Sequence, residues 1–283
     1  MNDAVLIHWS HALQHISRVD LLGPFNVRSP GWITFVEGTA QPLASFCITQ
    51  SPRFDMDCLQ ALATRCQESL IELRLSEFAK LTDEWLPTLA SFRSLRFLDI
   101  SHPATSVSEE ALIQLLAAVG ENLLHLNISG NGDLGNLIME SGLRLYMKNL
   151  VTLRASDLPL LTDDGIVELF SKDGEIPTAL PPLEIINLSR APDVGSNALN
   201  SILSHSGSTL RELNINGWKE TSNEALMELG GATPLLRKLD VGWCRSVDNF
   251  VMKSILDGCG NIQEILCAGC NRVGVDCPKK VSR

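Results

Sequence analysis

The sequence lacks the segments that would place a protein in or across a membrane. It contains no uncharged apolar run of about 18 residues, the length that a membrane-spanning helix needs. No basic segment followed by an apolar stretch stands at its start, as a secretory signal would require. We therefore expect the chain neither to span a membrane nor to be exported.

Positive charge is scarce. The 283 residues include 23 Lys plus Arg against 33 Asp plus Glu, which gives a formal net charge of −10. An acidic surface repels phosphate groups, so free nucleic acid is not the expected partner. The eight cysteines form no compact disulfide framework and indicate a reducing compartment.

Signatures of catalysis are also missing. The chain has no Gly-x-Ser-x-Gly elbow, no phosphate-binding loop and no paired-carboxylate pattern. We therefore expect no enzymatic activity and no cofactor. A binding surface is therefore the expected functional feature.

A repeated unit organises what is present. The pattern Leu-x-x-Leu-x-Leu, or a close apolar variant, occurs ten times at spacings of 25 to 33 residues. A further apolar residue follows eleven or twelve positions after each triplet begins, with Thr221 as the exception. The triplets begin at Ile16, Leu43, Leu70, Leu95, Leu123, Leu150, Leu183, Leu210, Leu236 and Ile262. This period and spacing are typical of leucine-rich repeats.

Each unit should contain a short strand, a turn and a helix of about three turns. Ser or Thr residues with Asp, Glu or Asn beside them, such as Ser108, Ser222 and Thr162, indicate helix starts. We predict one α/β domain over residues 1–283, a horseshoe-shaped leucine-rich-repeat solenoid of about ten repeats. Its parallel sheet should line the concave face and its helices the convex face. The longest unit carries a Pro- and Gly-containing loop at 173–182.

The ends of the solenoid are expected to be incomplete. Residues 3–13 predict a helix that exposes Val5, Leu6, Trp9 and Leu13, and only a short segment, 274–283, follows the last repeat. Solenoid ends need caps, because an open end leaves the core wet. The sequence therefore suggests a fragment or short form without an N-terminal cap, or a partner that covers that edge.

Three motifs suggest cofactor or metal sites, but the repeat register favours packing. Gly130 to Gly135 spell Gly-x-Gly-x-x-Gly between a strand and a helix, yet the other units have the same register without the glycines. Cys267 and Cys270, with Cys277, could suggest zinc, but the first two stand at packing and turn positions. The third motif is a set of histidines on one helical face without an acidic or cysteine partner, namely His8, His11 and His15.

The concave face is the first candidate binding surface. Side chains alternate across a strand, so the residue between the second and third apolar positions points away from the core. This column is mixed in charge and suits a protein partner. The candidate contact residues are Arg74, Asp99, Asn127, Arg154, Asn187, Asn214 and Asp240.

The C-terminal rim is the second candidate. Trp218 and Trp243 stand in the turns of adjacent units, with Lys219 and Arg245 beside them. Residues 236–283 hold eight basic and five acidic residues, a balance of +3 in an otherwise acidic chain. Aromatic and basic residues together suit an acidic protein or a nucleic acid. The alternative is that Trp218, at a turn position that cysteine fills in the next two units, is buried.

The cysteine-type repeats resemble those of F-box proteins and their relatives. Leu22-Gly23-Pro24-Phe25 with Trp32 and Phe35 resembles more specifically the Rad seven family of fungal UV excision-repair proteins. So do two further segments, Ser51-Pro52-Arg53-Phe54 and Cys270-Asn271-Arg272-Val273 with Cys277-Pro278-Lys279. The resemblance covers most of the chain, as that family's C-terminal solenoid.

This resemblance implies a nuclear, non-catalytic scaffold of nucleotide excision repair. The implied partners are a Swi/Snf-type ATPase with a RING finger and an elongin/cullin-type ubiquitin ligase, with damaged DNA reached only through the complex. The alternative is the substrate receptor of an F-box-type ubiquitin ligase, nuclear or cytoplasmic, whose groove recognises a protein destined for degradation.

Overall fold

A computed structural model describes residues 1–171 and 178–274. The predicted loop at 173–182 therefore lies partly outside the described residues, and Cys277 with the rest of 275–283 lies wholly outside them. The chain divides into two compact units, Met1–Asn131 and Gly132–Arg283. Each unit is described by itself, and the single domain over 1–283 stays a prediction.

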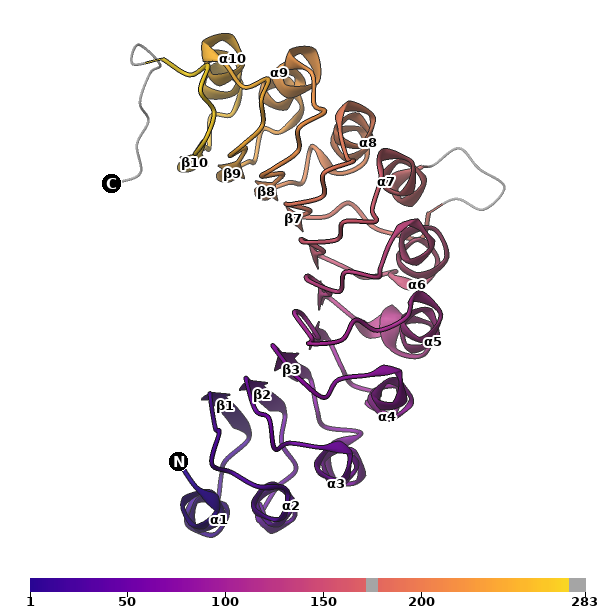
Figure 1. Ribbon diagram of the computed structural model, residues 1–283, viewed down its shortest axis with the longest axis vertical. Helices are drawn as coiled ribbons and strands as arrows, with labels where there is room; N and C mark the ends of the chain where they lie inside the picture. Colours follow the sequence, from indigo (N-terminus) through magenta and orange to yellow (C-terminus); the bar gives the residue numbers. More distant parts are fainter. Residues whose placement is uncertain (172–177, 275–283) are drawn as a thin grey trace. The chain divides into compact units, whose positions relative to one another are not determined.

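Five parallel strands and the helices that follow them make up the first unit (Figure 1). The strands are β1 (Arg18–Leu22), β2 (Ser45–Thr49), β3 (Glu72–Ser76), β4 (Phe97–Asp99) and β5 (His125–Asn127). The helices are α1 (Asp3–Ala12), α2 (Ser29–Gly38), α3 (Met56–Cys66), α4 (Leu86–Leu89) and α5 (Glu109–Val119). Two short 3-10 turns are η1 (Asp83–Trp85) and η2 (Gly120–Asn122).

The described part of the second unit has the same order of elements. Its strands are β6 (Thr152–Arg154), β7 (Ile185–Asn187), β8 (Glu212–Asn214), β9 (Lys238–Asp240) and β10 (Glu264–Leu266). A π-helical turn, η3 (Ile138–Leu143), leads into α6 (Arg144–Tyr146). The longer helices are α7 (Asp163–Phe170), α8 (Ser196–Ser206), α9 (Asn223–Ala232) and α10 (Asn249–Gly258).

The strand register confirms the predicted repeat phase. Neighbouring strands pair in sequence order, and the second apolar residue of each triplet lies opposite the next one, as Phe46 does with Leu73. The same row continues in the second unit, where Ile186 pairs with Leu213. In each unit the helices cover one face of the strands and leave the other open (Figure 1). The predicted α/β leucine-rich-repeat fold is therefore confirmed.

The core lies between the strands and the helices. The second apolar ladder is fully buried from Val27 to Val194, and Thr221, its polar exception, is buried too. An aromatic cluster in the first unit adds edge-to-face contacts, with Trp32 5.6 Å from Phe54 and Phe78 5.8 Å from Trp85 between ring centroids. Stacked repeats thus share one continuous apolar layer within each unit.

Several local predictions were wrong. Leu6 was expected to be exposed, but it is fully buried where α1 packs on α2. The expected three-turn helix shrinks to η1 with α4 in one repeat; in another, the helix over 136–146 keeps its expected length but contains the π-helical segment η3. In α4, Pro87 stands in the first turn, where its missing N–H is tolerated, and the helix ends two residues later.

Helix starts are stabilised by the preceding repeat. Ser108 and Ser222 cap their own helices, as predicted, by accepting from Ala111 N and Ala225 N at 3.3 and 3.2 Å. A second kind of cap joins repeats, because a side chain in the first turn of one helix accepts from the N-cap residue of the next. The pairs are Asp3 with Arg28, Asp83 with Ser108, Asn136 with Thr162, Asp163 with Gly195, and Ser196 with Ser222.

A left-handed residue recurs in every repeat, two positions after the triplet ends. All ten described residues with positive φ belong to this series: Gly23, Gln50, Glu77, His102, Gly130, Asp157, Arg190, Gly217, Trp243 and Gly269. The backbone N–H groups of eight of them extend the ladder between repeats, as in His102 N to Ser129 O at 2.7 Å. This bond offsets the roughly 1 kcal/mol that a non-glycine residue loses in this conformation.

Candidate partner-binding surfaces

The predicted contact residues form one row in each unit, which we call the outer column. In the first unit it contains Asp20, Cys47, Arg74, Asp99 and Asn127, paired in register across β1–β5. In the second unit it contains Arg154, Asn187, Asn214, Asp240 and Leu266, across β6–β10. The prediction that these residues share one face of the strands is confirmed within each unit.

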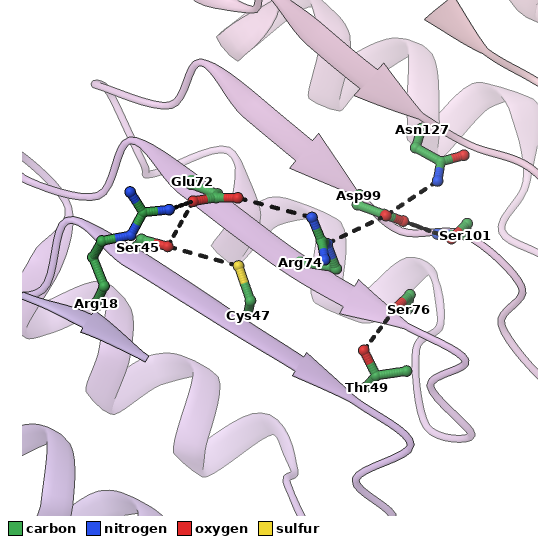
Figure 2. A network of polar contacts seen from close by, with 10 residues as sticks. All are labelled: Arg18, Ser45, Cys47, Thr49, Glu72, Arg74, Ser76, Asp99, Ser101 and Asn127. Carbon is green, nitrogen blue, oxygen red and sulfur yellow. Dashed lines mark hydrogen bonds and ion pairs between the residues drawn. The ribbon is translucent and has the colours of Figure 1, made fainter. Parts of the chain in front are cut away.

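In the first unit the charges of the outer face are joined to one another (Figure 2). The Arg74 guanidinium lies 3.6 Å from Asp99 Oδ2 and 3.9 Å from Glu72 Oε1. It also stacks on Phe97, with Cζ 5.4 Å from the ring centroid. Glu72 in turn forms an ion pair with Arg18 at 3.0 Å.

The carboxylate of Asp99 completes this network (Figure 2). Its Oδ1 accepts from the backbone N and the hydroxyl of Ser101, at 3.0 and 2.6 Å, and its Oδ2 accepts from Asn127 Nδ2 at 3.1 Å. Asp99 is buried by these contacts. Of the candidate residues, Arg74, Asp99 and Asn127 are therefore held by each other, and a partner would have to compete with that network.

Cys47 lies inside the same network and is not a reactive thiol. Its Sγ is 3.7 Å from Ser45 Oγ (Figure 2). Burial raises the pKa of the Cys47 thiol to about 11, so the thiol is protonated near neutral pH. The side chain packs and does not act as a nucleophile there.

The outer column of the second unit repeats the local turns of Asp99 and Asn127. Asn187 Oδ1 accepts from Ser189 N at 3.1 Å, and Asn214 Oδ1 accepts from Asn216 N at 3.0 Å. Asp240 Oδ1 accepts from Gly242 N at 2.9 Å and from Asn216 Nδ2 at 3.1 Å. These local turns fix each side chain by one oxygen and leave its other polar atom directed away from the turn.

A cavity of about 300 Å³ opens on this face. Four candidate residues line it, namely Arg154, Asn187, Asn214 and Asp240. Ile185, Glu212, Lys238 and Leu266 line it as well. Glu212 and Lys238 lie outside the predicted set of contact residues, although strand alternation puts them on the same face as Asn214 and Asp240. The cavity therefore extends the candidate site by one further column.

The rim prediction was wrong for Trp218. This side chain has 0% exposure, and its Nε1 donates to Leu188 O at 2.7 Å. Cys244 and Cys270, at the same repeat position, donate to the corresponding carbonyls of Ile215 and Val241. Trp218 is therefore the buried turn donor of its repeat and cannot contact a partner.

The remaining rim residues are accessible. Trp243 is 61% exposed, and Lys219 and Arg245 are exposed beside the turns. Trp243 is the left-handed residue of its repeat, and its indole lies over Gly269, where an added Cβ would come within 2.5 Å of the ring. The rim keeps one exposed aromatic residue and two cations among its four predicted members.

The glycine and cysteine motifs have packing roles. Gly130 is the left-handed turn residue of its repeat, and an added Cβ would approach His102 Nδ1 to 2.2 Å. Asn131 is fully buried and donates from Nδ2 to Ile100 O and Ile128 O. Within 1–171 and 178–274, no group of three His, Cys, Asp or Glu side chains could hold a metal ion. The same residues include no helix long and apolar enough to cross a membrane.

These features define a leucine-rich-repeat protein with an open strand face and no recognisable catalytic constellation among the described residues. No family model matches the chain. It is homologous to two DNA repair proteins over 96% of its length. It is 30% identical to rhp7 of Schizosaccharomyces pombe over 274 residues and 28% identical to RAD7 of Saccharomyces cerevisiae over 280 residues. It spans about half of each, 48% in both comparisons.

Solved structures support the fold. Rad7 in the crystal structure of the yeast Rad7–Elc1 complex matches 99% of this chain with a TM-score of 0.82 at 24% identity, over 69% of that chain. The leucine-rich-repeat protein LegL7 of Legionella pneumophila matches 92% of this chain with a TM-score of 0.54 at 16% identity, over 86% of its own. The homology to rhp7 and RAD7 confirms the predicted resemblance to the Rad seven family.

Proposed function

We propose that this chain is a non-catalytic protein-binding scaffold of nucleotide excision repair that acts in the nucleus. The observation that carries the proposal is homology over 96% of the chain to two proteins named for DNA repair. A leucine-rich-repeat solenoid offers an extended surface to partners, and such a surface suits an assembly subunit.

The proposed partners include an elongin C-type protein and, through it, a cullin-type ubiquitin ligase. The support is that the Rad7 chain with the same fold was crystallised in a complex with Elc1. A Swi/Snf-type ATPase with a RING finger is the second proposed partner, on the strength of the family resemblance. The net charge of −10 supports a route to damaged DNA through the complex rather than by direct phosphate contact.

One experiment tests the repair role in cells. A chimera of rhp7, in which residues 1–283 of this chain replace the matching region, is expressed in fission yeast that lacks rhp7. Survival after UV irradiation is measured. We expect survival to approach that of the wild type, with empty vector as the negative control. A folded, expressed chimera that leaves the cells as UV-sensitive as the deletion strain contradicts the proposal.

A second experiment identifies the ligase type. The purified chain is tested for co-elution with purified Elc1 and, in parallel, with a Skp-one-type adaptor. Co-elution with Elc1 alone supports the repair assembly. Co-elution with the Skp-one-type adaptor alone supports the alternative, an F-box-type substrate receptor.

A further inference from the structure

The charges that line the cavity of the second unit are not all neutralised within the protein. Lys238 pairs with Glu264 at 3.0 Å. Arg154 and Glu212, which also line the cavity, form no ion pair with residues 1–171 or 178–274. Asp240 uses only Oδ1 for its described contacts. Arg154 on β6 therefore has no counterion among the described residues. Neither does Glu212 on β8, and Oδ2 of Asp240 on β9 makes no described contact.

Two amide donors lie between these charges. The Oδ1 atoms of Asn187 and Asn214 are occupied by backbone N–H groups of their own turns. Because a carboxamide is planar, this bond directs Nδ2 to the other side, and Nδ2 of each has no hydrogen-bond partner among the described residues. In the first unit the equivalent Asn127 Nδ2 donates to Asp99 on the neighbouring strand. The second unit leaves the same donors available.

We propose that the strand face of β6–β9 binds an extended protein segment that carries an acidic and a basic residue three or four positions apart. The segment's carboxylate pairs with Arg154, and its cation with Glu212 and Asp240. Its backbone carbonyls accept from the Nδ2 atoms of Asn187 and Asn214. This inference rests on the proposed role of the chain as a protein-binding scaffold.

The spacing follows from sheet geometry. Neighbouring strands lie about 4.8 Å apart, so Arg154 on β6 and the carboxylates on β8 and β9 are separated by about 10–14 Å across the strands. An extended chain advances about 3.3 Å per residue, so three or four residues cover that distance. The cavity of about 300 Å³ accommodates a few side chains, and Ile185 and Leu266 supply apolar contact for their stems.

The charge pattern favours a protein segment over a nucleic acid. A phosphate backbone would satisfy Arg154, but its repeated negative charges would meet Glu212 on β8 and Asp240 on β9. A segment with both signs of charge matches all three groups. The first unit offers no such match, because Arg74 already lies between Glu72 and Asp99.

The test uses a synthetic nine-residue peptide with blocked termini, Gly-Thr-Glu-Ser-Thr-Ser-Lys-Thr-Gly, whose Glu and Lys are four positions apart. The control peptide has the same composition with Glu and Lys adjacent. Each is titrated into the ¹⁵N-labelled chain, and the side-chain amide signals of Asn187 and Asn214 are followed by NMR. We expect the spaced peptide to shift both signals and to bind at least fivefold more tightly than the control peptide.

Charge-reversal variants identify the contacts. Arg154→Glu should lower the affinity for the spaced peptide about tenfold. The same variant should bind more tightly a peptide whose own Glu is replaced by Lys. Glu212→Lys should weaken the spaced peptide and strengthen one in which its Lys is replaced by Glu. Arg93→Glu is the matched control, because Arg93 is exposed beside Glu68 in the other unit, and it should leave binding unchanged.

Several outcomes would overturn the inference. They are the absence of any shift of the two amide signals, equal affinity for the spaced and control peptides, and preferential binding of single-stranded DNA at this face. This test needs no repair partner. If the peptide does not bind but Elc1 co-elutes and UV survival is restored, the peptide-binding inference is refuted and the scaffold proposal stands. If the peptide binds but neither of those results is obtained, the repair role is refuted and the peptide-binding inference stands.

Discussion

Replacing Trp218 with Phe separates a structural tryptophan from a binding one. Trp218 is fully buried, and its Nε1 donates to Leu188 O at 2.7 Å. Phenylalanine keeps most of the ring volume and removes the donor, so the Leu188 carbonyl is left without this partner. The matched control is Trp243→Phe in the next repeat, where the side chain is 61% exposed.

The magnitude follows from two contributions. Leaving a buried carbonyl without its donor costs about 1–3 kcal/mol. The smaller ring leaves a small void, which adds about 1 kcal/mol. We therefore expect Trp218→Phe to lower the free energy of unfolding by about 2–4 kcal/mol. Trp243→Phe should change it by less than about 0.5 kcal/mol, because it lies on the surface.

The assay is urea denaturation of the two variants and the wild type, followed by far-UV circular dichroism. A lower midpoint for Trp218→Phe with an unchanged slope reports lost native stability rather than a changed unfolded state. Equal midpoints for the two variants would show that Trp218 is not a buried donor. In that case the original interpretation of Trp218 as a rim contact would regain its basis.

Three further predictions concern the turns, the thiols and acid. Gly130→Ala should lower the free energy of unfolding by about 1–2 kcal/mol, because φ is +73° and the added Cβ meets His102. Gly231→Ala should raise it by up to about 1 kcal/mol, because the added Cβ enters open space in α9. Urea denaturation measures both changes. In iodoacetamide labelling of the folded chain, half-exposed Cys267 should react before Cys244, whose pKa burial raises to about 12, and simultaneous labelling by mass spectrometry would contradict this. Burial alone would raise the pKa of Asp55, but hydrogen bonds from Ser29 and Cys58 lower it below its ordinary 3.8, so its contribution is present above that pH and is lost as pH falls through the folded value. Asp55→Ala should therefore cost about 1 kcal/mol at pH 7 and progressively less below pH 3.8, and a cost independent of pH would refute the carboxylate's role.

The fold followed from the sequence because burial imposes its period on the chain. The triplets and the second ladder place apolar side chains, with Thr221 as the polar exception, in the layer between strands and helices. Helix length did not follow. Between Asp83 and Leu89 the chain forms only a 3-10 turn and one α-helical turn, and the sequence pattern there did not predict so short a helix.

The sequence predicted where the candidate site residues lie on the strands, but not whether their charged side chains are paired within the protein. Strand alternation placed Arg74 and Arg154 in the outer column, but only side-chain geometry shows that Arg74 is paired and Arg154 is not. The left-handed series escaped prediction for a similar reason. At Gly130 the glycine itself indicates a positive φ. At His102 and Trp243 a hydrogen bond to the next repeat stabilises that conformation, and the residue type does not indicate it.

The helix caps between repeats give the chain a direction. In each of these pairs a backbone N–H of the later repeat donates to a side chain of the earlier one, as with Ser108 and Asp83 or Gly195 and Asp163. On the ribosome the earlier repeat is made first, so each new helix starts against a side chain already in place. Shortening a unit from its C-terminal side removes donors and leaves acceptors that water can satisfy. Removing an internal repeat takes the cap from the helix that follows, so the cost of a deletion depends on the side from which it is made.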